Sequence, residues 1–518
     1  MKLRNVVALL VVCAVTLLAQ EKTPPQLPAP GESLAMPDRV GVSGVEKRLS
    51  LEDAIAMAIQ NNTDVAIERT NIDTARQFLR AAQGVFDTNF RWQPGLAANN
   101  TPTSSILQGA NGKLAEHAMT QNFYVRQMIP RTGAQVSVGF ENSRNTSTNL
   151  FSSLNPFYTS KLNVELVVPL VRNREVDANR AQILVRRKQL DSSQVQFQER
   201  VINIVTQVEF AYWDLVGALQ DTQVQLDAVS LAQEQLAQDQ RQIKAGTLAP
   251  VELSAAEAEL EHRRDSLIAS VTTVTQAENN LKILLLGSRE DPLWNSRLIP
   301  VEEKINEPIE PKTVSEALSI ALKLRPELHD LALQSAANDV MVRLSRNQTR
   351  PQINLVGDYC NQGLAGTLRP GENPFTASSA ILYQRLNDVS TQLGLPPIPS
   401  IDFGSLPTSV IGGYGTAFNS VFAGRFQSVQ AGLQFDFSPR NRVAKAQLSE
   451  DLLAGKRLEL QQNRQRQLIE ADVRNALQSL ESARQRIVAT QASEAAAYDK
   501  LQSETRLFKT GESTNFLV

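Results

Sequence analysis

Apolar residues recur at every seventh position over a long, uninterrupted part of this chain. From about Asn173 to Ala245 the sequence contains no proline and one glycine, Gly217. A helix of this length would measure roughly 110 Å, several times the length of a typical globular helix. The recurring positions are Val201, Val208, Leu215, Val229, Leu236 and Ile243, interrupted only by Thr222. A heptad period of this extent predicts helices that supercoil against partner helices.

Two other regions alternate between apolar and polar residues, which is typical of strands. They are Phe86–Leu170 and Leu355–Phe437, and they hold about 19 of the chain's aromatic residues. Strands with one apolar face and aromatic ends are typical of a transmembrane β-barrel, although half-buried strands of a soluble sheet alternate in the same way. We favour the barrel, and expect these aromatic residues at the membrane interface: Phe90, Trp92, Phe435 and Phe437.

Three pairs of similar segments occur in the same order at a nearly constant offset, which predicts an internal duplication. They are Leu51–Ile59 with Val314–Leu322, Arg172–Arg174 with Arg440–Arg442, and Ile243–Val251 with Phe508–Phe516. Each copy should contain a helix capped by Ser50 or Thr313, a β-rich section, a very long helix and a turn. We assign residues 48–298 to the first repeat and 299–518 to the second. The second should be truncated before its last helix, and this chain should therefore not assemble a closed tunnel.

The N-terminus has the pattern of an export signal. Lys2 and Arg4 precede an apolar stretch of about 13 residues, Val6–Leu18, which suits a signal peptide and is too short to span a bilayer. We assign residues 1–20 to this signal peptide. Residues 21–47, which are rich in proline, should form an extended arm.

Composition excludes several classes of protein. The net charge of -2 offers no basic excess for nucleic acid, and a mean hydropathy of -0.23 without a second long apolar run argues against a helical membrane protein. Two cysteines and three histidines favour neither a disulfide scaffold nor a metal site. No catalytic constellation is present, because the glycine-rich run Gly412–Gly415 lacks the lysine and serine of a phosphate loop. We therefore expect no enzyme and no cofactor.

The number of strands predicts an oligomer. Each repeat should supply about two spanning strands, so that one chain has about four, fewer than the ~8 of the smallest closed barrels. An open sheet edge in lipid would leave backbone groups unpaired at several kcal/mol each. Several chains should therefore close one barrel together. The segments Asn99–Ala118 and Gly363–Gly412 should be long extracellular loops.

Several short motifs, together with the duplication, resemble the TolC-type outer-membrane efflux proteins. The motifs are Leu51–Ala58, Ala211–Leu215, Lys244–Thr247 and Leu324–Leu328. The resemblance implies an α+β membrane protein: a homotrimer whose four strands per chain form a 12-stranded β-barrel in the bacterial outer membrane. The barrel would continue as a long α-helical coiled-coil tunnel in the periplasm. The implied function is the exit duct of a tripartite efflux pump or type I secretion system. Its partners would be outer-membrane lipid, a periplasmic adaptor and an inner-membrane transporter of RND, ABC or MFS type.

The resemblance also assigns roles to two helix tips and one carboxylate. The adaptor would dock on the tips, which are Ala245, Gly246 and Thr247 in the first repeat and Thr510, Gly511 and Glu512 in the second. A glycine at these positions also suits the simple end of a helix, where a left-handed residue is common. Glu252 could narrow the tunnel as one of three symmetry-related side chains, or it could be an exposed glutamate at the start of a helix.

Two other functions are weaker alternatives. A periplasmic adaptor also has a long helical hairpin, but it combines one hairpin with small β domains and lacks a duplicated plan. A secreted coiled-coil enzyme or structural protein is disfavoured by the alternating, aromatic-rich strands.

Overall fold

The structure is a computed structural model that describes residues 39–42, 44–104, 112–301, 313–369, 374–399, 406–510 and 512. The expected signal peptide and most of the proline-rich arm lie outside these residues. The chain forms two compact units. Residues up to 67 and residues 199–309 make up the first, here called the hairpin unit. Residues 68–198 and 310–518 make up the second, here called the sheet unit, which combines part of the first expected repeat with nearly all of the second.

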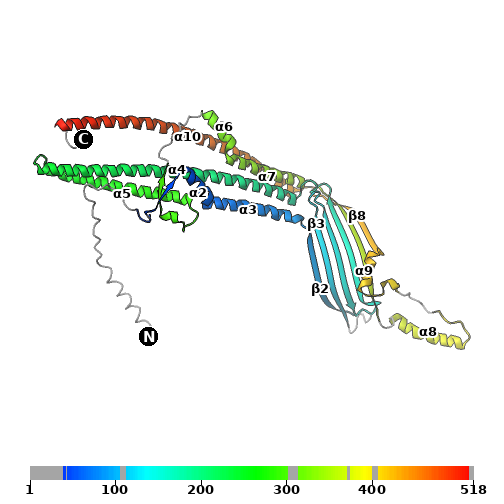
Figure 1. Cartoon of the computed structure of the whole chain (residues 1–518). Helices are drawn as coiled ribbons and strands as arrows, with labels where there is room; N and C mark the ends of the chain where they lie inside the picture. Colours follow the sequence, from blue (N-terminus) through cyan, green and yellow to red (C-terminus); the bar gives the residue numbers. More distant parts are fainter. Residues whose placement is uncertain are drawn as a thin grey trace, which may run out of the picture. The chain divides into compact units, whose positions relative to one another are not determined.

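The sheet unit contains one six-stranded sheet in the order β2–β3–β4–β5–β7–β8, with every neighbouring pair antiparallel (Figure 1). The strands are β2 (Asn89–Pro102), β3 (Lys113–Met128), β4 (Gln135–Ser147), β5 (Leu154–Pro169), β7 (Gln352–Leu368) and β8 (Phe426–Asp436). The prediction of about four strands is therefore wrong, because the first half of the chain supplies four and not two. The additional strands are the hairpin β3–β4.

The strand register separates the side chains into two faces of opposite character. One row across all six strands consists of Phe90, Val125, Val138, Val164, Tyr359 and Val429. The adjacent row, which points to the other side, consists of Asn89, Arg126, Ser137, Glu165, Asp358 and Gln430. Successive side chains of a strand point to opposite faces, so one side of the sheet is apolar and the other polar. We call these the apolar face and the polar face.

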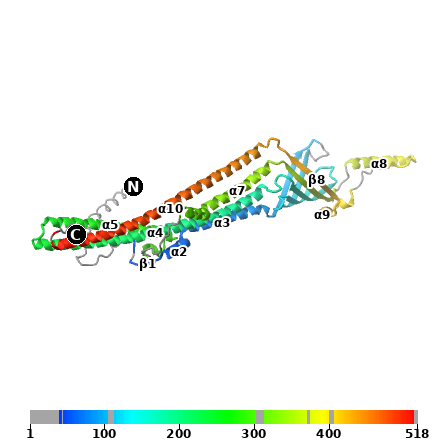
Figure 2. The same cartoon turned by 90° about the horizontal axis from the view of Figure 1, so that it is seen from above.

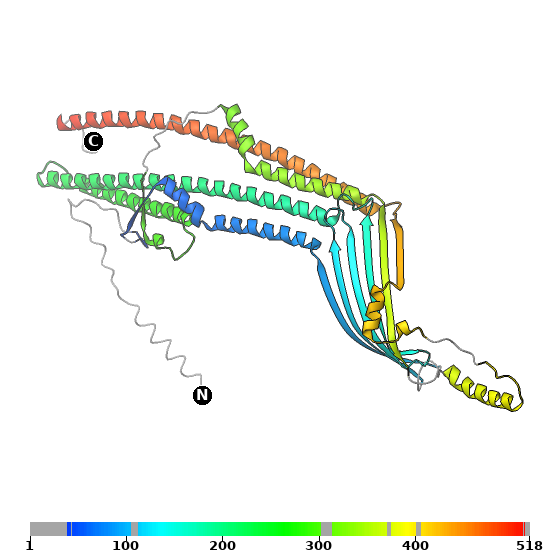
Figure 3. The same ribbon diagram turned by 45° about the vertical axis from the view of Figure 1, so that its right-hand side comes forward.

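The expected long loops are partly wrong as well. Between β2 and β3 only residues 103–112 connect the strands, because β3 begins at Lys113. The segment Gly363–Gly412 contains the end of β7, the helix α8 (Pro374–Gln392) and η3 (Thr408–Val410). The helix α9 (Tyr414–Phe422) follows this segment. The helix α9 lies against β5 and β7 (Figure 3). It packs closely at Gly363, where a Cβ would overlap the carbonyl oxygen of Ala417.

Helix α9 covers part of the apolar face. The ring of Phe418 meets Phe140 of β4 edge to face at 5.6 Å, and Tyr414 meets Tyr158 of β5 in the same way at 6.4 Å. Beneath it, Ser160 and Asn361 are buried although they belong to the apolar face. The helix therefore replaces a polar part of this face with aromatic and aliphatic side chains.

Besides α8 and α9, the sheet unit contains α3 (Thr63–Gln83, from residue 68), the first 21 residues of α4 (Ala178–Lys244), α6 (Val314–Leu324), α7 (Pro326–Gln348) and α10 (Arg442–Thr510). Helices α7 and α10 run side by side (Figure 2). Asp451 of α10 joins them, because its carboxylate accepts a hydrogen bond from Ser345 Oγ and its carbonyl accepts one from Asn338 Nδ2. The 67 residues of α4 and 69 of α10 confirm the predicted long helices.

The hairpin unit pairs the later part of α4 with α5 (Val251–Leu285). Its core keeps the heptad period in α5, where Leu260, Leu267, Val274 and Leu281 are buried. In α4 Thr222, which interrupts the apolar heptad, is also fully buried, and its hydroxyl donates to the carbonyl of Ala218. The heptad register therefore continues through this polar residue, because the helix itself satisfies its hydroxyl.

A short two-stranded sheet and one tyrosine tie the hairpin unit together. Strand β1 (Glu46–Leu49) pairs in parallel with β6 (Arg297–Pro300), which follows η2 (Pro292–Asn295), and α2 (Leu51–Asn61) follows β1. The buried Tyr212 donates its hydroxyl hydrogen to the carbonyl of Leu49 and accepts one from the amide of Val301. The expected caps are confirmed: Ser50 caps α2, and Thr313 forms a capping box with Glu316 at α6.

Within the described part of the chain, no helix has the length and apolar character needed to cross a bilayer. No group of histidine, cysteine and acidic side chains suited to a metal ion occurs among the same residues.

Candidate functional site

The tip at the end of α4 has the geometry predicted for it. Gly246 has a φ of 76°, in the left-handed region. Its amide donates to the carbonyl of Ile243 at 3.0 Å, and the amide of Thr247 donates to the carbonyl of Gln242 at 3.0 Å. Together these two bonds form a Schellman motif, which satisfies carbonyl groups that the end of a helix leaves free. A rigid turn therefore presents Ala245 and Thr247 at the end of the helix.

The tip at the end of α10 shares one of these bonds. The amide of Glu512 donates to the carbonyl of Leu507 at 2.9 Å, as Thr247 does to Gln242 in the other half of the chain. The two bonds are 265 positions apart at both ends. Thr510 is the last residue of α10, and Gly511 lies outside the described residues. The two tips belong to different units, so the turn at each tip is an independent observation.

Glu252 lies in the first turn of α5, with its side chain exposed. A carboxylate is favourable there because the N-terminal end of a helix carries partial positive charge. Its position fits an exposed helix-start glutamate, and a ring of such residues stays a prediction.

The polar face of the sheet carries charges of both signs. A hollow of about 530 Å³ on this face is lined by Arg91, Arg126, Glu141 and Glu165, among others. The hydroxyl of Tyr124 donates to a carboxylate oxygen of Glu141 at 3.1 Å. Such a surface can be wetted and offers partners to solutes of either charge. The opposite face exposes Phe90, Trp92 and Phe435, as expected of residues that contact lipid, and Phe437 is exposed just beyond β8.

Comparison with known proteins finds one family that matches part of the chain. Residues 128–287 match the family model described as outer membrane efflux protein. This part of the chain is similar to the outer membrane efflux proteins. No curated protein matches the chain.

Several solved outer-membrane channels share the fold of this chain. The channel CmeC of Campylobacter jejuni is 13% identical with a TM-score of 0.57, and the match covers 95% of this chain and 86% of that one. CusC is 14% identical with a TM-score of 0.57, covering 90% and 84%. The outer membrane protein VceC of Vibrio cholerae is 14% identical with a TM-score of 0.53, covering 90% and 88%. At these identities the likeness establishes the fold alone.

Two asparagines mark the junctions between the sheet and the helices. Asn173, between β5 and α4, has a φ of 66°, and Asn441, between β8 and α10, has a φ of 36°. Both contact the end of α7: Asn173 Oδ1 accepts from Gln348 Nε2 at 2.6 Å, and Asn441 Nδ2 donates to the carbonyl of Gln348 at 3.2 Å. Asparagine tolerates the left-handed region better than most residues. The repeated Arg-Asn-Arg segments thus form corresponding strand-to-helix turns, a role that their sequence alone did not indicate.

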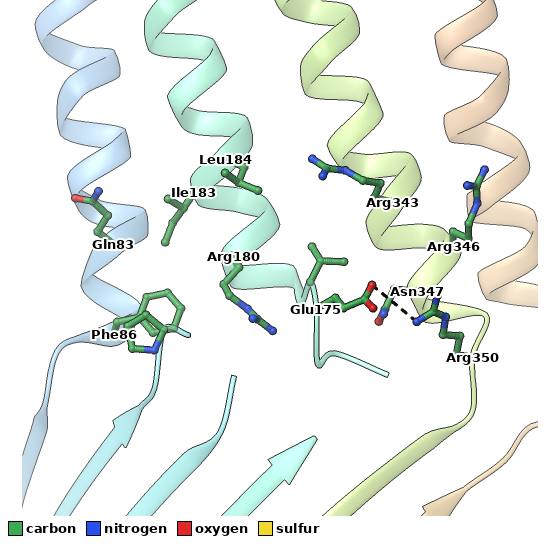
Figure 4. A pocket seen from close by; sticks show the side chains of 12 residues that line it. Gln83, Phe86, Glu175, Arg180, Ile183, Leu184, Arg343, Arg346, Asn347 and Arg350 are labelled. Atoms are coloured by element: carbon green, nitrogen blue, oxygen red, sulfur yellow. Dashed lines mark ion pairs between the residues drawn. The ribbon is translucent and has the colours of Figure 1, made fainter. Parts of the chain in front are cut away.

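A pocket at this junction was not predicted from the sequence. It has a volume of about 760 Å³ and contains Arg180 of α4, Arg343 and Arg346 of α7, and Arg350 just beyond the end of α7 (Figure 4). The spacing of Arg343 and Arg346, three residues apart, is the signal that could have placed these two on one face of a helix.

Proposed function

We propose that this protein is the exit duct of a tripartite efflux pump or a type I secretion system, through which substrates leave the cell passively. The observation that carries the proposal is the two-faced sheet, with an apolar row and a polar row side by side across all six strands. An apolar face suits lipid and a polar face suits a water-filled lumen. Helices of 67 and 69 residues in the same chain suit a periplasmic tunnel.

Three copies would close the barrel. The edge strands are β2 and β8, and the sheet contains an even number of strands. Because neighbouring strands alternate in direction, β8 of one copy is antiparallel to β2 of the next, as pairing in an outer-membrane barrel requires. Unpaired edges in lipid would cost several kcal/mol for each backbone group. Three sheets of six strands give a barrel of 18 strands, wider than the 12 expected from the family resemblance.

The duct needs partners at its periplasmic end. We infer that a periplasmic adaptor docks on Ala245–Thr247 and on the turn after Thr510, and that it connects the duct to an inner-membrane transporter of RND, ABC or MFS type. The support is the rigid turn at Gly246 together with the matching bond at Glu512. Glu252, six residues beyond Gly246, would then line the narrow end of the tunnel.

Electrophoresis of the membrane-extracted protein tests this proposal against the expectation from the repeats that this chain does not assemble a closed tunnel. Unboiled in SDS, the full chain should migrate as a slow band of trimer size, and boiling should convert it to the monomer, because closed barrels resist SDS. The extracted protein should also form conducting pores in planar bilayers. A chain that migrates as a monomer before boiling and forms no pores would contradict the proposal, whereas an adaptor would behave in that way.

A further inference from the structure

The arginine pocket lies where the sheet meets the helices of the sheet unit. Its walls come from the ends of α3 and α7, from the start of α4 and from the turn between β3 and β4 (Figure 4). Four arginines line it against one carboxylate, Glu175. This pocket therefore carries a net positive charge.

The arginines are not equally available to a ligand. Arg180 is engaged by the protein: Nε donates to Asp177 at 2.5 Å, and Nη2 donates to the carbonyl of Asn173 at 2.6 Å. Arg350 reaches Glu175 only at 4.0 Å, and both side chains are largely exposed. Within the described residues, neither Arg343 nor Arg346 forms an ion pair, and both are exposed. The guanidinium groups of Arg343 and Arg346 are thus free to bind an anion, and Arg350 is engaged only by its long ion pair with Glu175.

The other wall of the pocket is apolar. Phe86, Pro130, Ile183 and Leu184 line it. A small soluble anion makes no favourable contact with an apolar wall, whereas a lipid has a charged headgroup for the arginines and apolar chains for this wall. The volume of about 760 Å³ is also large for a single phosphate and falls within the usual range of ligand pockets.

The arginine pocket is separate from the hollow that the polar face forms at this junction. This hollow of about 390 Å³ is lined by Gln352 and Asn354 of the polar face, together with Leu344 and Gln348 of α7. Helix α7 therefore contributes Leu344 and Gln348 to the hollow on the polar side, and Arg343 and Arg346 to the arginine pocket.

We propose that the arginine pocket binds the headgroup of an anionic phospholipid from the periplasmic leaflet of the outer membrane. The inference rests on the proposed function, which puts the apolar face in lipid and the strand-to-helix junction at headgroup level. Guanidinium groups bind phosphate oxygens through paired hydrogen bonds, and basic pockets at membrane surfaces select acidic headgroups. The bound lipid would join α3, α4 and α7 at the membrane boundary.

Native mass spectrometry of the detergent-extracted full chain tests the inference. The protein is incubated with phosphatidylglycerol or phosphatidylcholine, and the retained lipid is counted. The variant R343Q/R346Q/R350Q should retain phosphatidylglycerol about 10- to 100-fold less than the unmodified protein, given the typical contribution of each arginine to binding an acidic membrane. The matched control R457Q/R464Q/R466Q removes three exposed arginines of α10 and should retain the lipid as before.

Two further measurements keep the result decisive. Circular dichroism checks that the variant is folded, and R343K/R346K/R350K replaces it if it is not, with reduced retention expected because lysine lacks the paired donors. Inorganic phosphate at the lipid concentration should not displace phosphatidylglycerol. Equal retention by the variant and the unmodified protein would overturn the proposal, as would equal retention of both lipids or displacement by phosphate. Retention is measured without efflux or trimer formation, so its failure is distinct from failure of the proposed duct.

Discussion

The two halves of the chain contribute to the sheet in different ways. The first half supplies four strands joined by short connections, including the additional hairpin β3–β4. The second supplies only β7 and β8, and the connection between them carries α8 and α9. The first half therefore makes the sheet wider through backbone pairing alone. The second covers part of the apolar face with a helix, which depends on particular side chains and on a glycine.

Removing the additional hairpin should have the largest effect. Deleting residues 103–147 joins the end of β2 to the connection before β5, and both strands keep the directions needed for antiparallel pairing. Each copy would then supply four strands. Because barrel diameter grows roughly linearly with strand number, the single-channel conductance in planar bilayers should fall to about half. An unchanged conductance in a trimer that still resists SDS would show that the hairpin does not belong to the barrel wall.

The contribution of the second half depends on Gly363. Replacing Gly363 by alanine puts a Cβ against the carbonyl of Ala417, and should destabilise the packing of α9 by about 1–3 kcal/mol. Gly357→Ala is a matched control on the same strand and the same face, with no atom within 4 Å of its Cβ. Limited proteolysis should cut near α9 faster in Gly363→Ala only. Equal cutting of both variants would mean that α9 is not held at this glycine.

The two strand-to-helix junctions, at Asn173 and Asn441, should contribute differently to the stability of the protein. Asn173→Ala should destabilise the protein by about 1–2 kcal/mol for the left-handed backbone, with further loss from its hydrogen bond at 2.6 Å to Gln348. Asn441→Ala should cost less, since its bonds to the end of α7 are longer, at 3.2 and 3.4 Å. Denaturant unfolding of the extracted protein measures both. Asn173→Gly should recover most of the stability that is lost through the left-handed backbone. A larger loss of stability in Asn441→Ala than in Asn173→Ala would contradict this prediction.

Substitutions at the helix tip should have the smallest effect on stability. The same change from glycine to alanine should destabilise the tip and stabilise the interior of α4. Gly246→Ala forces a residue with a Cβ into the left-handed region and should cost about 1 kcal/mol. Gly217→Ala, at an exposed position inside α4, should instead stabilise by about 0.5–1 kcal/mol. Thermal unfolding followed by circular dichroism measures both. Stabilisation by Gly246→Ala would argue against the turn that we describe.

Much of this fold could be read from the sequence where a pattern repeats locally. The caps at Ser50 and Thr313, the long helices and the alternation of β5 and β8 are such patterns. The strand count was not readable, because His117 and Gln121 put polar residues on the apolar face of β3 and mask its alternation. Backbone pairing holds that strand regardless. The arginine pocket was hidden for another reason: Arg180 and Arg343 are far apart in the sequence, and only the folded sheet unit brings them together.

Disulfide formation between the edge strands tests the central claim most directly. In a Cys360→Ser background, Gln93→Cys of β2 is combined in turn with Ser428→Cys, Gln430→Cys or Gln434→Cys of β8, all on the polar face. The edges lie at opposite ends of the sheet within one copy. If copies close one barrel, at least one pair should give a trimer-sized, reducible band after oxidation and boiling. Only monomers, in every combination, would contradict the account.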